Sequence, residues 1–71
     1  MKRGFSKQLS AFSIKVKAQR LAKGLTQIEL AAKMDVDVRT IKRLESKKSN
    51  PTLETVFAVA HGLGVDIKDL F

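Results

Sequence analysis

The chain has 71 residues with 14 basic and 7 acidic side chains, one histidine and no cysteine. This length holds a single domain and excludes a two-domain enzyme, and the lack of thiols excludes disulfides, iron–sulfur clusters and cysteine-ligated zinc. The net charge of +7 is unevenly spread, because residues 1–48 carry 13 basic and 4 acidic side chains whereas residues 49–71 carry 1 and 3.

Such a basic surface favours nucleic acid as the partner, ahead of an anionic membrane or an acidic protein. Membrane insertion is not expected, because the longest apolar run covers only residues 56–60, whereas a bilayer needs roughly 20 residues. Lys7, Gln8 and Lys15 interrupt the stretch after the basic start, so the hydrophobic region of a secretion signal is missing. We therefore expect a cytoplasmic protein.

All predicted elements are helices, because no stretch shows strand-like alternation and no hairpin signal is present. Residues 1–8 are expected to form a loose basic arm and residues 9–71 the folded domain. The first helix runs from about Lys7 to Lys23, and Gly24 ends it. Two rows repeat along it at helical spacing. The inward row is Leu9, Phe12, Val16 and Arg20, and the row beside it is Ile14, Ala18 and Leu21.

Two short helices are expected next. Thr26 and Glu29 have the spacing of a capping box, in which hydroxyl and carboxylate bind unpaired backbone N–H groups at a helix start. This second helix is short, because the turn formers Asp35 and Asp37 follow it. Asp37 is expected to cap a third helix from Val38 to about Ser46. The inward side chains of the two helices are Leu30, Ala31 and Met34, then Ile41 and Leu44.

A loop at residues 47–51 precedes the fourth helix, which Thr52 caps and Gly64 ends. Its expected core side chains are Leu53, Val56, Phe57, Ala60 and Leu63. Asp66 caps a last turn, Ile67 to Phe71. The sequence therefore predicts a compact all-α fold of five helices.

The stretch from Gln27 to Glu45 carries the functional signal. Two short helices joined by a tight turn cross closely only where small or apolar residues meet. Ala31 is the small residue expected at the crossing, and Val36 is the apolar residue expected in the turn. This pattern is typical of a helix-turn-helix, whose second helix enters the major groove of DNA. A helical wheel places Ile41 and Leu44 on the packed side of the third helix.

The opposite side of that helix presents cations, a hydroxyl and a small apolar group: Val38, Arg39, Lys42, Arg43 and Ser46. Arginine forms bidentate hydrogen bonds with guanine, and valine contacts the methyl group of thymine. The alternative interpretation of this surface is a solvated basic helix face with no ligand.

Five motifs carry a family resemblance: RLAKGLTQ at 20–27, ELA at 29–31, TIKRLE at 40–45, NPTL at 50–53 and GLGV at 62–65. From roughly Phe12 to Phe71 the chain resembles the Cro and phage-repressor type of helix-turn-helix domain, the xenobiotic-response-element (XRE) family of bacterial and phage regulators. The resemblance implies a lambda-repressor-like fold and a sequence-specific transcriptional regulator that binds double-stranded DNA in the bacterial nucleoid.

The resemblance also implies roles for individual residues. Side chains matching Val38, Arg39 and Arg43 read base edges, with Lys42 beside them. Backbone phosphates are bound at the start of the second helix and in the loop after the third, here by Thr26, Gln27, Lys48, Ser49 and Asn50. Arg20 and Glu45 match a structural ion pair between the first and third helices. Two positions depart from the family, since Asp35 and Lys47 stand where glycine is common.

Catalysis and cofactors are not expected. His61 has no cysteine or suitably placed carboxylate to work with, so it is interpreted as a surface residue. Asp35 and Asp37 are explained by turn and cap chemistry rather than by metal binding. No metal, cofactor or small-molecule ligand is therefore predicted. An antitoxin-like or adaptor module that binds chiefly another protein remains the alternative function.

A homodimer on a near-palindromic operator is expected, because one such domain alone covers only roughly 600 to 1,000 Å² of DNA-facing surface. The predicted contact surface lies in the last seven residues: Val65, Ile67, Leu70 and Phe71.

Overall fold

The computed structural model describes residues 5–47 and 50–71. The elements in these ranges are α1 (Ser6–Ala22), α2 (Gln27–Met34), α3 (Val38–Glu45), α4 (Leu53–Leu63) and η1 (Ile67–Leu70). The first four are α-helices and η1 is a 3-10 helix. The all-α prediction is confirmed, with the fifth expected helix reduced to a 3-10 turn.

Side-chain caps start the helices of the helix-turn-helix. The Thr26 hydroxyl accepts the N–H of Glu29 at 3.0 Å, and a Glu29 carboxylate oxygen accepts the N–H of Thr26 at 2.8 Å, which completes the predicted capping box. Asp37 accepts the N–H of Arg39 at 2.8 Å, as expected for an N-cap. The starts of α2 and α3 were therefore predictable from local chemistry.

The left-handed turn between α2 and α3 is made by Asp35. Its φ and ψ are 56° and 47°, a conformation that aspartate tolerates better than most side chains. Val36 then donates its N–H to the carbonyl of Ala31 at 3.0 Å. The Val36 side chain was expected to plug this turn, but it is exposed and lines an open recess with Met34 and Thr40. At the end of α3, Ser46 is extended, so Lys47 does not continue the helix.

Helix α1 begins at Ser6, one residue before the start near Lys7 that the sequence predicts. Residues 6–8 of the expected arm are therefore helical, and residues 1–4 of that arm lie outside the described residues. Phe5 supplies the first carbonyl of the helix, which accepts the N–H of Leu9 at 2.9 Å.

One apolar core joins every helix. Its buried members are Phe12, Val16, Leu30, Ala31, Ile41, Leu44, Val56, Val59, Ala60, Leu63 and Leu70. The expected inward row of α1 is therefore correct, with Leu9 half-buried. The row beside it, Ile14, Ala18 and Leu21, is exposed. The helices that contact α1, which are α3, α4 and η1, pack against its inward row and leave this second row uncovered.

Two core assignments in α4 were also wrong. Leu53 is 71% exposed and Phe57 is 55% exposed. The buried stripe of α4 instead uses Val56, Val59 and Ala60, followed by Leu63 one turn later, and Phe57 falls beside that stripe. Val59, which is fully buried, was not identified from the sequence.

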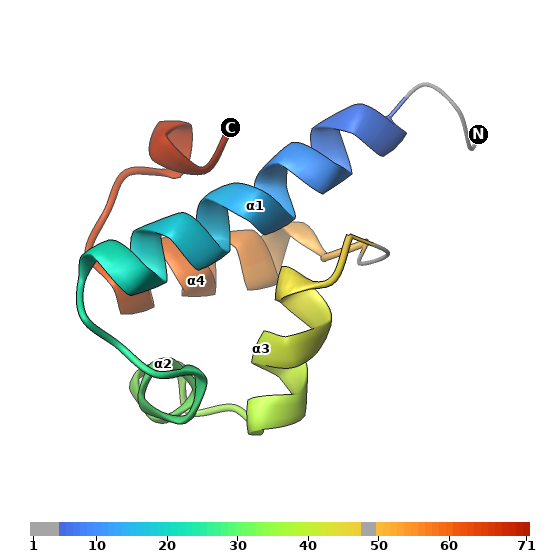
Figure 1. Ribbon diagram of the computed structural model, residues 1–71. Helices are drawn as coiled ribbons and strands as arrows, with labels where there is room; N and C mark the ends of the chain where they lie inside the picture. Colours follow the sequence, from blue (N-terminus) through green and yellow to red (C-terminus); the bar gives the residue numbers. More distant parts are fainter. Residues whose placement is uncertain (1–4, 48–49) are drawn as a thin grey trace.

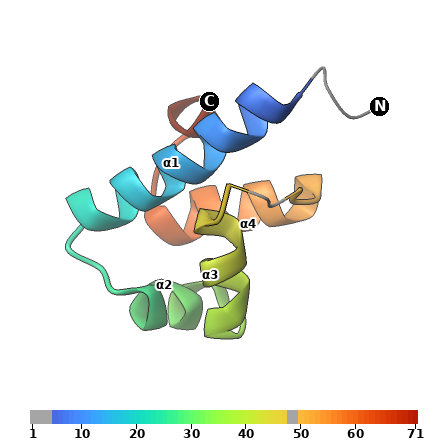
Figure 2. The same cartoon turned by 45° about the vertical axis from the view of Figure 1, so that its right-hand side comes forward.

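Figure 1 shows α1 crossing above the α2–α3 pair, with α4 behind it. Here α2 is viewed almost along its axis while α3 lies nearly in the plane, so the two helices cross steeply. Figure 2 shows that η1 stays beside α1, at the end of the molecule opposite α2 and α3. The helix-turn-helix therefore forms one end of the domain.

The residues after α4 fold back onto α1. Leu70 is fully buried, and the rings of Phe12 and Phe71 stack with centroids 5.3 Å apart. Lys15 Nζ donates to the backbone oxygen of Phe71 at 2.7 Å. Leu70 therefore belongs to the protomer's own core rather than to an outer surface. Of the C-terminal surface predicted to bind a second copy, Phe71 is exposed, and Val65 and Ile67 are partly buried against the core.

Candidate nucleic-acid interface

Helix α3 is held by α1 through a buried ion pair. Arg20 Nε lies 2.6 Å from Glu45 Oε2, and Arg20 Nη2 donates to Glu45 Oε1 at 3.0 Å. The side chains are only 9% and 5% exposed. The hydrogen bonds that Arg20 donates to the Glu45 carboxylate raise the pKa of Arg20. The residues that the family resemblance pairs are thus in direct contact.

Further hydrogen bonds extend this network to α2. The third arm of the guanidinium, Nη1 of Arg20, donates to the carbonyl of Leu25 at 2.8 Å. Gln27 Nε2 donates to Glu45 Oε1 at 3.2 Å. One carboxylate therefore connects the end of α1, the start of α2 and the end of α3, which fixes α3 relative to the start of α2.

Ser13 provides a second anchor that sequence reasoning missed. Its side chain is fully buried in α1, and its Oγ donates to the carbonyl of Ser46 at 2.9 Å. That carbonyl comes just after α3, where backbone acceptors lack partners within the helix. A serine between the core residues Phe12 and Val16 was the available signal, since a buried hydroxyl needs a partner.

The outward face of α3 is cationic and open. Arg39, Lys42 and Arg43 are exposed, whereas Ile41 and Leu44 are buried. The helical wheel therefore assigned the two faces correctly. Among the residues described, nothing covers these cations, so a ligand with negative charge can approach the length of the helix.

Val38 lies between the two faces. It is half-buried against the edge of the core and also lines an open recess of about 290 Å³ between α2 and α3. The recess is lined by Thr26, Gln27, Ile28, Val38 and Lys42. Ile28 is 70% exposed there, although sequence reasoning did not single it out. The apolar recess lies beside positively charged side chains. It can therefore receive a methyl group that belongs to a negatively charged polymer such as a nucleic acid.

Arg39 is paired with the cap of its own helix. Its Nε donates to Asp37 Oδ1 at 3.2 Å and its Nη2 donates to Asp37 Oδ2 at 3.3 Å. These hydrogen bonds and the backbone bond from Arg39 lower the pKa of Asp37. From the sequence, Asp37 was predicted only as a cap. An acid and a base two residues apart at a helix start were the signal for the pair.

The predicted phosphate-binding residues fall at two places. Thr26 and Gln27 lie at the start of α2, with Thr26 exposed and its hydroxyl engaged in the capping box. Asn50 is exposed in the loop before α4, while Lys48 and Ser49 lie outside the described residues.

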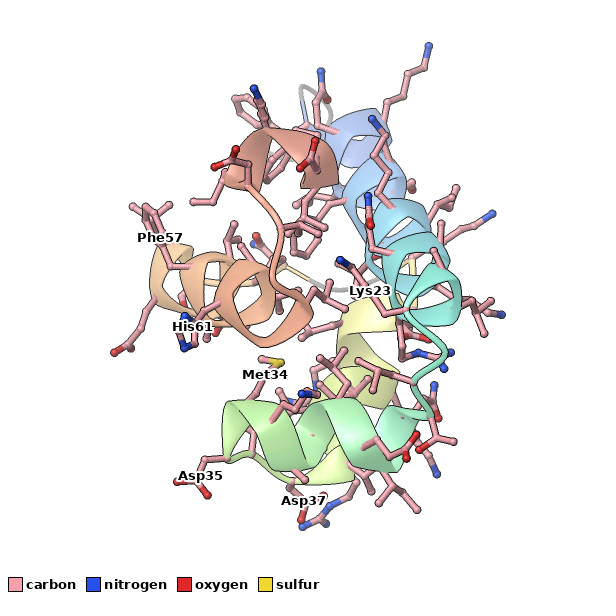
Figure 3. The ribbon with its side chains drawn as sticks, turned by 90° about the vertical axis from the view of Figure 1, so that its left-hand side faces the viewer. Lys23, Met34, Asp35, Asp37, Phe57 and His61 are labelled. Atoms are coloured by element: carbon pink, nitrogen blue, oxygen red, sulfur yellow. The ribbon has the colours of Figure 1, made fainter. Side chains whose placement is uncertain are left out.

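A different face carries His61. Figure 3 shows His61 on α4 and Lys23 at the end of α1, two residues that line an open hollow, with Met34 of α2 directed toward α4. His61 is exposed, as predicted. In residues 5–47 and 50–71, no group of three or more histidine or acidic side chains is close enough to hold a metal ion. The same ranges contain no helix that is long and apolar enough to cross a membrane.

Comparison with known proteins agrees with this geometry. A family model described as helix-turn-helix matches residues 16–70. An uncharacterized HTH-type transcriptional regulator from Methanocaldococcus jannaschii is 40% identical over 57 residues, which are 80% of this chain and 86% of that protein.

Two crystal structures are similar over almost the whole chain. The restriction-modification controller protein C.AhdI from Aeromonas hydrophila has a TM-score of 0.85 and 28% identity, and the match covers 92% of this chain and 98% of that one. The C.Esp1396I controller protein, solved as a tetramer in complex with its natural 35 base-pair operator, has a TM-score of 0.79 and 32% identity, with 96% and 97% covered. The chain therefore belongs to the helix-turn-helix family of transcriptional regulators, in its Cro and phage-repressor type.

Proposed function

We propose that the protein is a sequence-specific transcriptional regulator that binds double-stranded DNA and reads the major groove with residues 38–46. The observation that carries this proposal is the open cationic face of α3, which stands opposite the buried side chains Ile41 and Leu44. An α-helix fits the major groove, where each base pair presents a distinct set of hydrogen-bonding groups. Similarity to an operator-bound controller protein supports the same interpretation.

Within this proposal the base-reading side chains are Val38, Arg39, Lys42 and Arg43. The arginines suit guanine, whose O6 and N7 accept a pair of N–H donors, and Val38 suits the methyl group of thymine. Lys42 is able to reach either a base or a phosphate. The ion pair of Arg20 with Glu45 lies behind the helix and holds it in position.

Phosphate contacts set the register of the helix on DNA. Gln27 is proposed for this role with Thr26, Asn50 and the loop residues Lys48 and Ser49. The amide nitrogen of Gln27 carries two N–H groups, and the bond to Glu45 uses one of them. The other can donate to a phosphate oxygen at the start of α2, where the helix dipole favours an anion.

A homodimer on a near-palindromic operator completes the proposal, with the two α3 helices about 34 Å apart. Phe71, Val65 and Ile67 form part of the proposed contact, and the exposed Leu53 and Phe57 add apolar surface that sequence reasoning had placed in the core. The tetramer of C.Esp1396I in complex with its operator supports assembly on DNA. Sedimentation that shows only a monomer, both free and on operator DNA, would contradict this part.

The proposed mode of action is a repressor or controller that occupies DNA in the cytoplasm, without catalysis, cofactor or small-molecule ligand. It is tested by selecting bound sequences from random duplex DNA at two salt concentrations. We expect a palindrome to be enriched and the affinity to fall steeply as salt rises. Arg39→Ala should weaken operator binding about tenfold, since a base contact contributes about 1 to 3 kcal/mol.

The matched control is Lys23→Ala at the end of α1, which removes one positive charge on the different face that carries His61. It should leave the selected sequence unchanged. If no sequence is enriched at low salt, the protein-binding alternative is favoured instead.

A further inference from the structure

The two arginines on the outward face of α3 differ in their surroundings. Arg39 binds the carboxylate of Asp37 through Nε at 3.2 Å and Nη2 at 3.3 Å. In the described part of the chain, Arg43 has no ion-pair partner. If both arginines face DNA, only Arg39 reaches it with its orientation already restricted.

The carboxylate that restricts Arg39 is itself fixed. Asp37 Oδ1 also accepts the backbone N–H of Arg39 at 2.8 Å, so the acid is tied to the first turn of α3. A guanidinium presents five N–H donors in a planar fork. Asp37 occupies the edge formed by Nε and Nη2, and the end formed by Nη1 and Nη2 stays directed away from it. That end offers two parallel N–H groups, which is the arrangement that guanine O6 and N7 accept.

Neither stability nor capping requires an aspartate at this position. The Arg39 and Asp37 side chains are 82% and 55% exposed, and an exposed ion pair contributes little to the free energy of folding. Serine or asparagine would cap α3 as well as aspartate does. On a surface that faces a polyanion, the extra negative charge of aspartate lowers the attraction for phosphates. The aspartate therefore weakens general DNA binding while it orders Arg39.

We propose that Asp37 is a positioning residue that holds the Arg39 guanidinium for one guanine and reduces its attraction for phosphates. Asp37 thus increases discrimination between sequences at the expense of non-specific affinity. This inference rests on the proposed function, because it assigns a role within the same surface.

The test compares Asp37→Ser with Asp35→Asn in the full chain. Serine keeps the cap without the carboxylate. Asp35→Asn removes the same charge two residues away at an exposed position, and asparagine also tolerates the left-handed backbone found there. Arg39→Ala first identifies the base pair that Arg39 reads. Dissociation constants are then measured for the operator, for variants at that base pair and for unrelated duplex DNA, at two salt concentrations.

For Asp37→Ser we expect tighter binding to unrelated DNA, a salt slope that is steeper by about one, and about tenfold less discrimination at the Arg39 base pair. Asp35→Asn should preserve that discrimination, even if its affinity for all DNA rises. Asp37→Ser added to Arg39→Ala should cause no further loss of discrimination. Equal thermal midpoints for Asp37→Ser and the parent protein would show that the cap is intact.

Two outcomes overturn the inference. If the parent protein selects a sequence but Asp37→Ser discriminates at the Arg39 base pair as well as Asp35→Asn does, Asp37 has no positioning role and the proposed function stands. If the parent protein selects no sequence at all, the proposed function and this inference both fail.

Discussion

Arg20 and Glu45, which lie 25 residues apart in sequence, meet through two short contacts in the interior of the domain. Charged side chains buried in this way depend on each other, because removal of one leaves the other without water or a partner. The pair also joins α1 to the end of α3, so it contributes both to folding and to the position of the outward face.

We therefore expect Glu45→Ala to lower the free energy of unfolding by about 3 to 5 kcal/mol. Glu45→Gln should lower the free energy of unfolding by less, because the glutamine amide keeps the shape of the side chain and its oxygen still accepts one hydrogen bond. The double variant Arg20→Met with Glu45→Leu should lose less stability than the sum of the two single changes, since no charge is left unpaired. Urea unfolding measures these values, and additive losses would contradict the coupling.

Gly62 allows α4 to approach α2. A Cβ atom at this position would lie 2.7 Å from Cγ of Met34 and 3.4 Å from Cδ1 of Leu30. Overpacking of this kind costs about 1 to 3 kcal/mol, which exceeds the gain of about 1 kcal/mol that alanine brings to a helix. We expect Gly62→Ala to be destabilising in urea unfolding. Met34→Ala should lower the free energy of unfolding much less in the Gly62→Ala protein than in the parent protein. A Gly62→Ala protein that is more stable than the parent would refute the close contact.

The capping box of α2 makes stability depend on pH. The hydrogen bond from the Thr26 backbone is the largest cause that lowers the pKa of Glu29 below its ordinary value of 4.5. A lowered pKa in the folded state means that the stabilisation is present above the ordinary value and is lost as the pH falls through the folded value. The thermal midpoint should therefore decrease between about pH 6 and about pH 3. Glu29→Gln should flatten this decrease, and an unchanged slope would contradict the assignment.

The methyl contact proposed for Val38 can be tested on the DNA. Replacing one thymine of the selected operator by uracil removes a single methyl group and preserves base pairing. Burial of one such group contributes about 0.8 kcal/mol, so we expect about fourfold weaker binding at the contacted position. Val38→Ala should bind the two operators with equal affinity. Ile28→Ala changes the other apolar side chain of the same recess and serves as the comparison. If the parent protein binds every uracil-substituted operator as tightly as the original operator, the contact is excluded.

Local chemistry made much of the fold predictable. Threonine and aspartate caps, the left-handed Gly64 and the inward row of α1 depend on neighbouring residues, so the chain itself encodes them. The errors came where apolar residues outnumber the positions that a small core can cover. Leu53 and Phe57 on α4 have core-like spacing, and only the packing of other helices decides that they remain exposed.

The candidate site was predictable to the same extent. The wheel of α3 assigned Arg39, Lys42 and Arg43 to the open face, because helical periodicity needs no tertiary information. The contacts of Ser13 with the carbonyl of Ser46 and of Gln27 with Glu45 join segments more than 15 residues apart, as their separations of 33 and 18 residues show. Such contacts depend on how the helices cross, which periodicity does not reveal.

The single carboxylate of Glu45 receives donors from Arg20 and Gln27 in a position that excludes most solvent. A change at any of these three residues leaves a polar group without its complement where water cannot replace it. The exposed side chains of α3 carry no such penalty. If Arg39, Lys42 and Arg43 read bases as proposed, their exchange can direct the protein to a new operator, while the buried residues beneath them have to stay unchanged.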